Sequence, residues 1–259
     1  MKPVCLIIGA GAGIGGHVGK RFARDGYHII LSRRSDASGL ENLVKDIVQD
    51  GGSAEGRLLN IVDENAIENL IHDIEKNSGP IEVVVHNIGA QIGNRRLTDT
   101  SLKTFELGWR LSCFSLFRLA YTVLPLMAQR GKGALLVTSS TAAQRGNAGQ
   151  HSHAAAMGGR RMLCQSLNAE FASQNIHVAH IVIDGAVDAP DTLGKMLGPE
   201  AFEKLRKDKG SEDGLMLPEH IADTYFHIAQ QHRSVWTHEL DLRSFSDEAW
   251  WNHAVNIEF

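Results

Sequence analysis

The sequence predicts a single α/β domain, built as a doubly wound parallel sheet of about seven strands with helices on both faces. Three observations predict it. Short apolar runs alternate with amphipathic helical patterns along the whole chain, as a parallel sheet with crossover helices requires. A glycine cluster separates the first apolar run from the first helical pattern. The chain has 259 residues, 43% apolar and 22% charged, which is ordinary for one globular domain.

The glycine cluster follows the first expected strand, residues 3–8, and precedes a helix that begins near residue 16. Glycine lets the backbone turn sharply and approach a pyrophosphate, and a helix start offers free N–H groups to an anion. Two spacings fit: Gly11, Gly13 and Gly16, or Gly9, Gly13 and Gly15. We prefer the second, because it begins directly after the strand. Strand, turn and helix together predict a Rossmann-type dinucleotide site. Its expected cofactor-binding residues are Gly9, Gly11, Gly13, Ile14 and Gly15.

The other elements follow in order. Further strands are expected at 27–31, 54–59, 81–85, 134–138, 176–183 and 235–240. Helices are expected at about 40–49, 101–130, 152–173 and 200–207. Two more are expected to begin after Asp63, which serves as an N-cap, and after Pro218. The otherwise irregular stretch 184–217 is too long for an ordinary connection, so a substrate lid is expected at about 186–217 of the single domain 1–259. Its apolar residues fit an apolar ligand and core packing equally well; they are Leu193, Met196, Leu197, Leu215, Met216 and Leu217.

Composition narrows the range of partners. The net charge of −4 gives no general attraction to nucleic acid or to an anionic membrane. We see no signal peptide, and no apolar run near the ~20 residues of a membrane span. The three cysteines, Cys5, Cys113 and Cys164, are widely spaced and odd in number, which favours core residues in a reducing compartment. We therefore expect a cytoplasmic protein that binds neither nucleic acid nor membrane.

These motifs together resemble the short-chain dehydrogenase/reductase family over nearly the whole chain. The glycine turn matches, residues 86–89 (His-Asn-Ile-Gly) are similar to the family's Asn-Asn-Ala-Gly, and residues 138–140 match the strand end with its catalytic serine. Residues 184–187 correspond to its Pro-Gly turn. The resemblance implies a nicotinamide dinucleotide, a small-molecule substrate, and homodimers or homotetramers. It places further residues at the cofactor: Asn60, Asn87, Gly89 and Val187.

The chain departs from the family at the reaction centre. The family uses a tyrosine, a lysine four residues later and a serine thirteen residues earlier, and these positions hold His153, Met157 and Ser140 here. Ser112 stands where the family has an asparagine. An imidazole titrates near ~6.5, so His153 could exchange a proton unaided, whereas Met157 offers neither charge nor donor. The candidate catalytic residues are therefore Ser140 and His153.

Neighbouring residues are interpreted more simply. Either Arg160 or Arg161 could point at the cofactor, but charged residues at such positions usually form solvated helix surface, and we interpret both in this way. His151 and His153 lie two apart at a helix start with no third ligand nearby, so no metal site is predicted. Trp236, Trp250 and Trp251 are expected to be core or interface residues.

The residues after the second strand indicate the cofactor. An acidic residue there would bind a ribose 2′-hydroxyl, but the sequence has Arg33 and Arg34, which can bind a 2′-phosphate. NADP(H) is therefore favoured over NAD(H). The sequence predicts an atypical NADP(H)-dependent oxidoreductase acting on a carbonyl or alcohol. The alternative is a catalytically silent relative that binds dinucleotide as a sensor or interaction protein. Elimination chemistry is a weaker third reading, because the resemblance ties it to the missing tyrosine.

Overall fold

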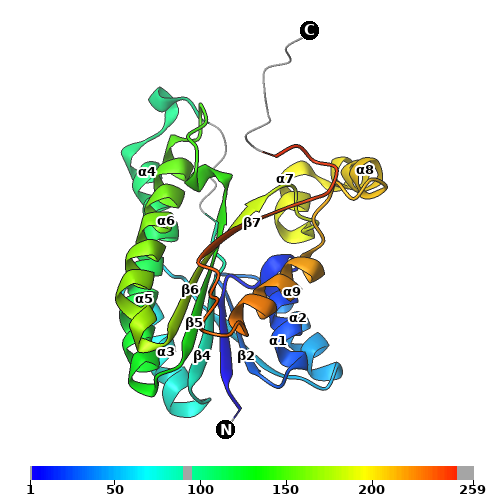
Figure 1. The fold of residues 1–259 in the computed structure, drawn as a ribbon. Coiled ribbons are helices and arrows are strands. Elements are labelled where there is room, and N and C mark those ends of the chain that lie inside the picture. The colour runs from blue at the N-terminus through cyan, green and yellow to red at the C-terminus, as the bar shows by residue number, and fades with distance from the viewer. Residues whose placement is uncertain (1, 90–94, 250–259) are drawn as a thin grey trace.

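The structure, a computed structural model, describes residues 2–89 and 95–249. Seven parallel strands form one sheet in the order β3-β2-β1-β4-β5-β6-β7 (Figure 1). The strands are β1 (Val4–Ile8), β2 (His28–Arg33), β3 (Ser53–Leu58), β4 (Ile81–His86), β5 (Gly133–Ser140), β6 (Ile176–Asp184) and β7 (Glu239–Arg243). The predicted doubly wound parallel sheet is confirmed.

Helices cover both faces of the sheet (Figure 1). On one face lie α3 (Ala66–Asn77), α5 (Ser115–Arg130) and α6 (His151–Phe171). On the other lie α1 (Ile14–Arg24), α2 (Ala37–Gln49) and α9 (Pro218–Ala229). Side chains of β1 alternate between the two cores, Leu6 and Ile8 toward the first and Cys5 and Ile7 toward the second, as the pleat of a strand requires. Both faces are therefore buried, which explains the near-continuous apolar strands in the sequence.

The predicted long helix is interrupted. It consists of α4 (Leu102–Trp109), a π-helical turn (Arg110–Phe114) and α5. The 29-residue stretch has the length and composition of a membrane span, so the expectation that no segment does is wrong by that test. Half of its most apolar window is nevertheless buried inside the protein, against the sheet, α3 and α6. We interpret it as a core helix of this layer.

Several predicted boundaries need correction. Asp63 does not cap α3; Asn65 occupies that position, and the Asp63 carboxylate accepts a hydrogen bond from the Asn60 amide at 2.7 Å. The last strand begins at Glu239, four residues later than expected. Residues 184–217 are more ordered than expected: they hold a π-turn (Pro190–Gly194), α7 (Lys195–Leu197) and α8 (Pro199–Gly210).

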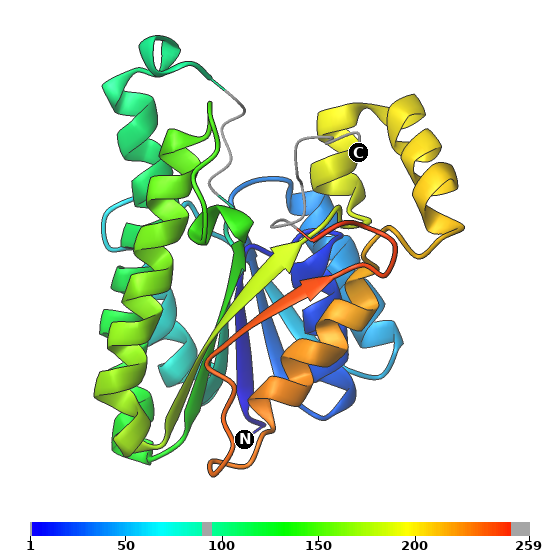
Figure 2. The same ribbon diagram turned by 45° about the horizontal axis from the view of Figure 1, so that its top comes forward.

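The sheet has a switch point between β1 and β4, from which the strand order runs outward in both directions. The glycine turn leaves the carboxyl end of β1 at this point, where open α/β sheets bind their ligands. Figure 2 shows α7 and α8 at the end of the sheet toward which the β6 and β7 arrows point, across from α4 and the start of α6. The fold therefore gathers its loops over that end.

Candidate functional site

The glycine turn is shaped by backbone contacts that exclude side chains. Gly9 has φ +99°, and a Cβ there would lie 2.4 Å from the Asn87 carbonyl oxygen. A Cβ at Gly15 would lie 2.4 Å from the Gly9 carbonyl oxygen. The Asn87 side chain donates to that same carbonyl at 2.9 Å, so it fastens β4 to the turn. Glycine is required at both positions, and also at Gly16, where a Cβ would lie 2.4 Å from the Gly11 carbonyl oxygen, so these contacts fit both spacings.

Two adjoining cavities surround the turn. The first, of about 340 Å³, is lined by Arg33, Arg34, Asn60 and Asp191 together with the glycines. The second, of about 310 Å³, is lined by Ser140, His153, Met157, Arg160 and Val187, with Gly13, Ile14 and Gly15. Gly9, Gly11, Asn87, Ile88 and Gly89 line both. The sequence-predicted residues are thus brought together into one continuous cleft.

Arg33 is the main cation of the first cavity. Its Nη2 lies 3.1 Å from an Asp36 oxygen and 3.3 Å from Asp191 Oδ2. Its Nη1 is buried and has no hydrogen-bond partner in the described part of the chain. Asp36 does not line the cavity, because its carboxylate caps α2 through the Gly39 N–H. That hydrogen bond, with smaller contributions from Ser38 and Arg33, lowers the pKa of Asp36. The cavity is therefore lined by the Arg33 side chain and not by the Asp36 carboxylate.

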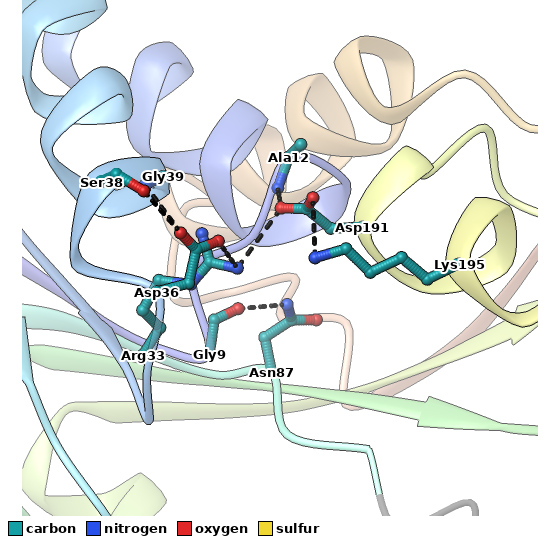
Figure 3. A network of polar contacts seen from close by, with 9 residues as sticks. All are labelled: Gly9, Ala12, Arg33, Asp36, Ser38, Gly39, Asn87, Asp191 and Lys195. Atoms are coloured by element: carbon teal, nitrogen blue, oxygen red, sulfur yellow. Dashed lines mark hydrogen bonds and ion pairs between the residues drawn. The ribbon is translucent and has the colours of Figure 1, made fainter.

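Asp191 supplies an anion to the glycine turn (Figure 3). Its Oδ2 accepts from the Ala12 N–H at 3.1 Å, and Lys195 lies 3.4 Å from Oδ1. Burial raises the pKa of Asp191, but the Ala12 N–H and the charges of Lys195 and Arg33 outweigh it, so the pKa lies below its usual range. The carboxylate occupies donors that suit a phosphate oxygen. The residues present therefore fit a phosphate-bearing dinucleotide.

Ser140 and His153 meet in the second cavity. Ser140 ends β5 and His153 lies in the first turn of α6, both half-buried. Ser140 Oγ lies 3.2 Å from His153 Nε2, within hydrogen-bond reach. The thirteen-residue spacing thus brings a hydroxyl and an imidazole to one place. A group that can exchange a proton near neutral pH faces a cavity joined to the glycine turn.

Met157 is buried one helical turn beyond His153. Its sulfur lies 3.9 Å from the hydroxyl oxygens of both Ser112 and Ser139. No charge or strong donor enters the cavity from this position. Ser112 lies in the π-turn and is also buried.

The interpretation of Arg160 as solvated surface is wrong. Arg160 is fully buried and lines the second cavity, whereas Arg161 forms a two-point ion pair with Glu239 of β7. Adjacent helix positions point about 100° apart, so the two arginines face different surroundings. The sequence signal was available: Arg160 shares its helix face with the apolar positions 157, 164 and 167.

The other residues that the sequence analysis considered lie as follows. Val187 pairs with Met216 through an isolated parallel bridge. His151 contacts Thr100, away from the partner of His153, and no cluster of metal-ligating side chains occurs within residues 2–89 and 95–249. Leu215 and Met216 belong to the core, while Met196 and Leu197 are exposed. Trp236 stacks on His177, while Trp250 and Trp251 lie outside the described residues.

The comparisons with known proteins agree with this geometry. The family model described as short chain dehydrogenase matches residues 3–193. The chain belongs to this family. A curated relative, the 7alpha-hydroxysteroid dehydrogenase of Escherichia coli (strain K12), is 29% identical over 200 residues, covering 77% of this chain and 76% of the relative.

Solved structures of the family superpose on nearly the whole chain. A short-chain dehydrogenase from Rhodopseudomonas palustris gives a TM-score of 0.78 at 28% identity, covering 94% of this chain and 99% of that one. A 7 alpha-hydroxysteroid dehydrogenase complexed with NADH and 7-oxo glycochenodeoxycholic acid gives 0.80 at 26% identity, covering 93% and 92%. Membership places the chain among oxidoreductases that use a nicotinamide dinucleotide.

Proposed function

We propose that this chain is an NADP(H)-dependent oxidoreductase that interconverts a carbonyl and an alcohol, atypical for its family in using His153 as the proton-transferring group. The observation that carries the proposal is the 3.2 Å contact between Ser140 Oγ and His153 Nε2, inside a cavity joined to the glycine turn. The named relatives act on small molecules that carry hydroxyl or oxo groups. Their chemistry supports the class of reaction proposed here.

Ser140 and His153 have different roles at the substrate oxygen. In the direction of reduction, the Ser140 hydroxyl donates a hydrogen bond that orients the carbonyl oxygen. Protonated His153 gives its proton to that oxygen as the carbonyl carbon gains a hydride, and is left as neutral imidazole. When bound, the reduced dinucleotide supplies the hydride. The product is the alcohol, and in oxidation His153 takes the proton back.

The preference for NADP(H) has to rest on this chain's own residues, since a solved relative holds NADH. Arg33 has a buried donor without a partner, and Arg34 is exposed beside it at the first cavity. Asp36 is occupied at the start of α2. A 2′-phosphate would therefore find two cations there, with Asp191 as the carboxylate that competes for Arg33.

One observation favours the alternative, a silent relative that binds dinucleotide as a sensor or interaction protein. The buried Met157 offers neither the charge nor the donor that the family resemblance assigns to its position. A reaction centre that depended on that side chain alone would be inactive.

The deciding experiment measures NADPH oxidation by the purified protein with a panel of aldehydes and ketones, beside the His153→Phe variant. NADPH and NADH affinities are measured by fluorescence titration on both proteins. Turnover that disappears in the variant while affinity persists supports the enzyme. Tight NADPH binding without turnover on any substrate supports the sensor instead, and binding of neither dinucleotide overturns both.

A further inference from the structure

Arg160 is a buried arginine at the back of the second cavity. Its side chain is 1% exposed. Nη2 donates to the carbonyl oxygens of Ile88 at 2.7 Å and Ser112 at 3.1 Å, and Nη1 donates to that of Thr138. Nε also donates to Ser112, at 3.3 Å. The guanidinium thus holds together the end of β4, the π-turn and β5, three segments that form the cavity wall.

The positive charge of Arg160 is bound by neutral groups in the part of the chain that the structure describes. Within the described residues, no carboxylate pairs with Arg160, and its ligands are neutral carbonyl groups. Burial lowers the pKa of Arg160 to about 10, so the side chain stays protonated at neutral pH. An unpaired buried cation is costly, and an apolar residue could fill the same space at lower cost. The charge therefore calls for a reason beyond packing.

The charge lies close to the proton-transferring group. Arg160 and His153 lie seven residues, about two turns, apart on the same face of α6, and both line the second cavity. Arg160 binds the Thr138 carbonyl, and Ser140, two residues further along β5, contacts His153. Seven residues at the helical rise of ~1.5 Å each place the two positions about 10 Å apart along α6. Across that distance inside a protein, one charge shifts the pKa of another group by about one unit.

We propose that Arg160 is the fixed positive charge of the reaction centre. It favours neutral imidazole at His153 and stabilises negative charge on a substrate oxygen at Ser140. With 1% of its side chain exposed, it acts from behind the cavity wall as a positioning residue and does not replace a direct contact with the cofactor ribose. The inference rests on the proposed function, since it assigns Arg160 the electrostatic part of the role that the resemblance gives to a lysine at position 157.

The other ionisable groups of the described residues near His153 are an arginine and two histidines. Arg95 and His151 line a small pocket on the outer side of His153. Deeper in the protein, burial and the charge of Arg160 hold the pKa of His86 well below its usual range, so that side chain is neutral. No carboxylate of the described residues lines either pocket that His153 borders. Among the described residues that line these two pockets, the charged side chains are those of Arg95 and Arg160, and Arg160 is the buried one.

The test is an NMR titration of the His153 imidazole in the cofactor-free full-length protein, for wild type, Arg160→Gln, Arg160→Lys and the control Arg161→Gln. Arg160→Gln should raise the pKa of His153 by about one unit, because a nearby cation disfavours the protonated ring. Arg160→Lys should restore most of the wild-type value, and Arg161→Gln should leave it unchanged. A merely structural Arg160 would show no such dependence on charge. An unchanged pKa in a folded Arg160→Gln overturns the proposal.

A second measurement covers the case in which Arg160→Gln does not fold. In wild type alone, a His153 pKa at or above the ordinary ~6.5 overturns the proposal, because the field of Arg160 would be absent. The titration needs neither cofactor nor turnover, so its failure is distinct from failure of the proposed function. Where Arg160→Gln folds and turnover is found, its kcat should fall at least tenfold, with NADPH affinity within about threefold of wild type and partial recovery in Arg160→Lys. Undiminished kcat also counts against the proposal.

Discussion

Asp191 Oδ2 lies 3.1 Å from the main-chain nitrogen of Ala12, across 179 residues of sequence (Figure 3). The same oxygen lies 3.3 Å from Arg33 Nη2. The segment after β6 thus places a carboxylate on two donors that a cofactor phosphate would use. Because this carboxylate stays ionised at neutral pH, it competes with an incoming anion for those donors.

Asp191→Asn should tighten NADPH binding. The amide keeps the shape of the side chain but removes the competing negative charge, and a charge-assisted hydrogen bond is worth about 1.5–3 kcal/mol. We expect the Kd for NADPH to fall about tenfold to a hundredfold, with a smaller change for NADH. Fluorescence titration of both reduced dinucleotides measures it.

The matched control is Asp188→Asn, three residues earlier on the same segment. Asp188 pairs with Arg206 on α8 and does not line the first cavity, so its removal should leave both affinities unchanged. Weaker NADPH binding by Asp191→Asn would show that this carboxylate helps to hold Arg33 for the cofactor and does not compete with it.

The two arginines of the first cavity should contribute unequally. Arg33→Ala should weaken NADPH binding by about 1.5–3 kcal/mol, because Arg33 is a largely buried cation that lines the cavity. Arg34→Ala should cost less than about 1 kcal/mol, because Arg34 is exposed and screened by water. NADH affinity should not change in either variant. Equal losses for NADPH and NADH would show that Arg33 supports the fold of the site and not a 2′-phosphate.

The fold and the glycine turn could be predicted from local pattern alone. Apolar runs and amphipathic periods determine which segments become buried strands and helices, and the turn at Gly9 obeys backbone sterics. Boundaries were less predictable. Asn65 takes the cap position expected of Asp63. The last strand begins only at Glu239, four residues after its predicted start. Tertiary pairing sets such ends, and it has no local signal.

The site could be predicted only in part. Ser140 and His153 have a fixed spacing on adjacent elements, so their meeting followed from the resemblance. Asp191 reaches the glycine turn through long-range chain folding that no local motif encodes. The burial of Arg160 was not predicted, because arginine is rarely buried without a carboxylate partner. That general tendency was given more weight than the position of Arg160 on an apolar face of its helix.

Stability should fall in mild acid because of buried neutral histidines. Burial lowers the pKa of His180 to about 4, although Glu239 opposes it. The unfolded chain takes up this proton near pH ~6.5 and the folded chain only near pH 4, so stability is lost as pH falls between these values. Each such histidine lowers the free energy of unfolding by about 1.4 kcal/mol for every pH unit of acidification within this range. The lowered pKa of His86 acts in the same direction.

Urea denaturation at pH values from about 7.5 to 5 measures this loss. His180→Gln should reduce the slope of stability against pH, whereas His72→Gln, on the exposed side of α3, should not. Glu239, whose pKa is lowered first by Arg161, adds a further loss at lower pH. A stability that stays level down to pH ~5 would contradict the assignment of a neutral buried His180.

The chain should assemble through the outer face of α4, α5 and α6. Phe117 and Tyr121 stack there with 47% and 74% of their areas exposed, and Trp109 and Met162 are also exposed. Tyr121→Glu should convert a symmetric dimer into monomers or a tetramer into smaller assemblies, while Val48→Glu, at a residue of α2 that is 52% exposed, should not. Light scattering at micromolar concentration measures it. A wild type that shows only the 28.3 kDa monomer contradicts the expected assembly.

The last prediction concerns the pH dependence of turnover. Reduction requires protonated His153, so the rate should fall as pH rises through the pKa of that imidazole. His153→Phe should abolish turnover and leave NADPH affinity nearly unchanged. His153→Tyr alone should give little turnover, because a phenol with its ordinary pKa of ~10 needs a nearby cation, whereas His153→Tyr with Met157→Lys should raise the rate, because the ammonium lowers the pKa of the phenol. A pH–rate series on aldehydes and ketones compares the four proteins. If His153→Phe keeps full activity, another group carries the proton. If its pH profile also matches that of wild type, the contact between Ser140 and His153 has no part in the chemistry.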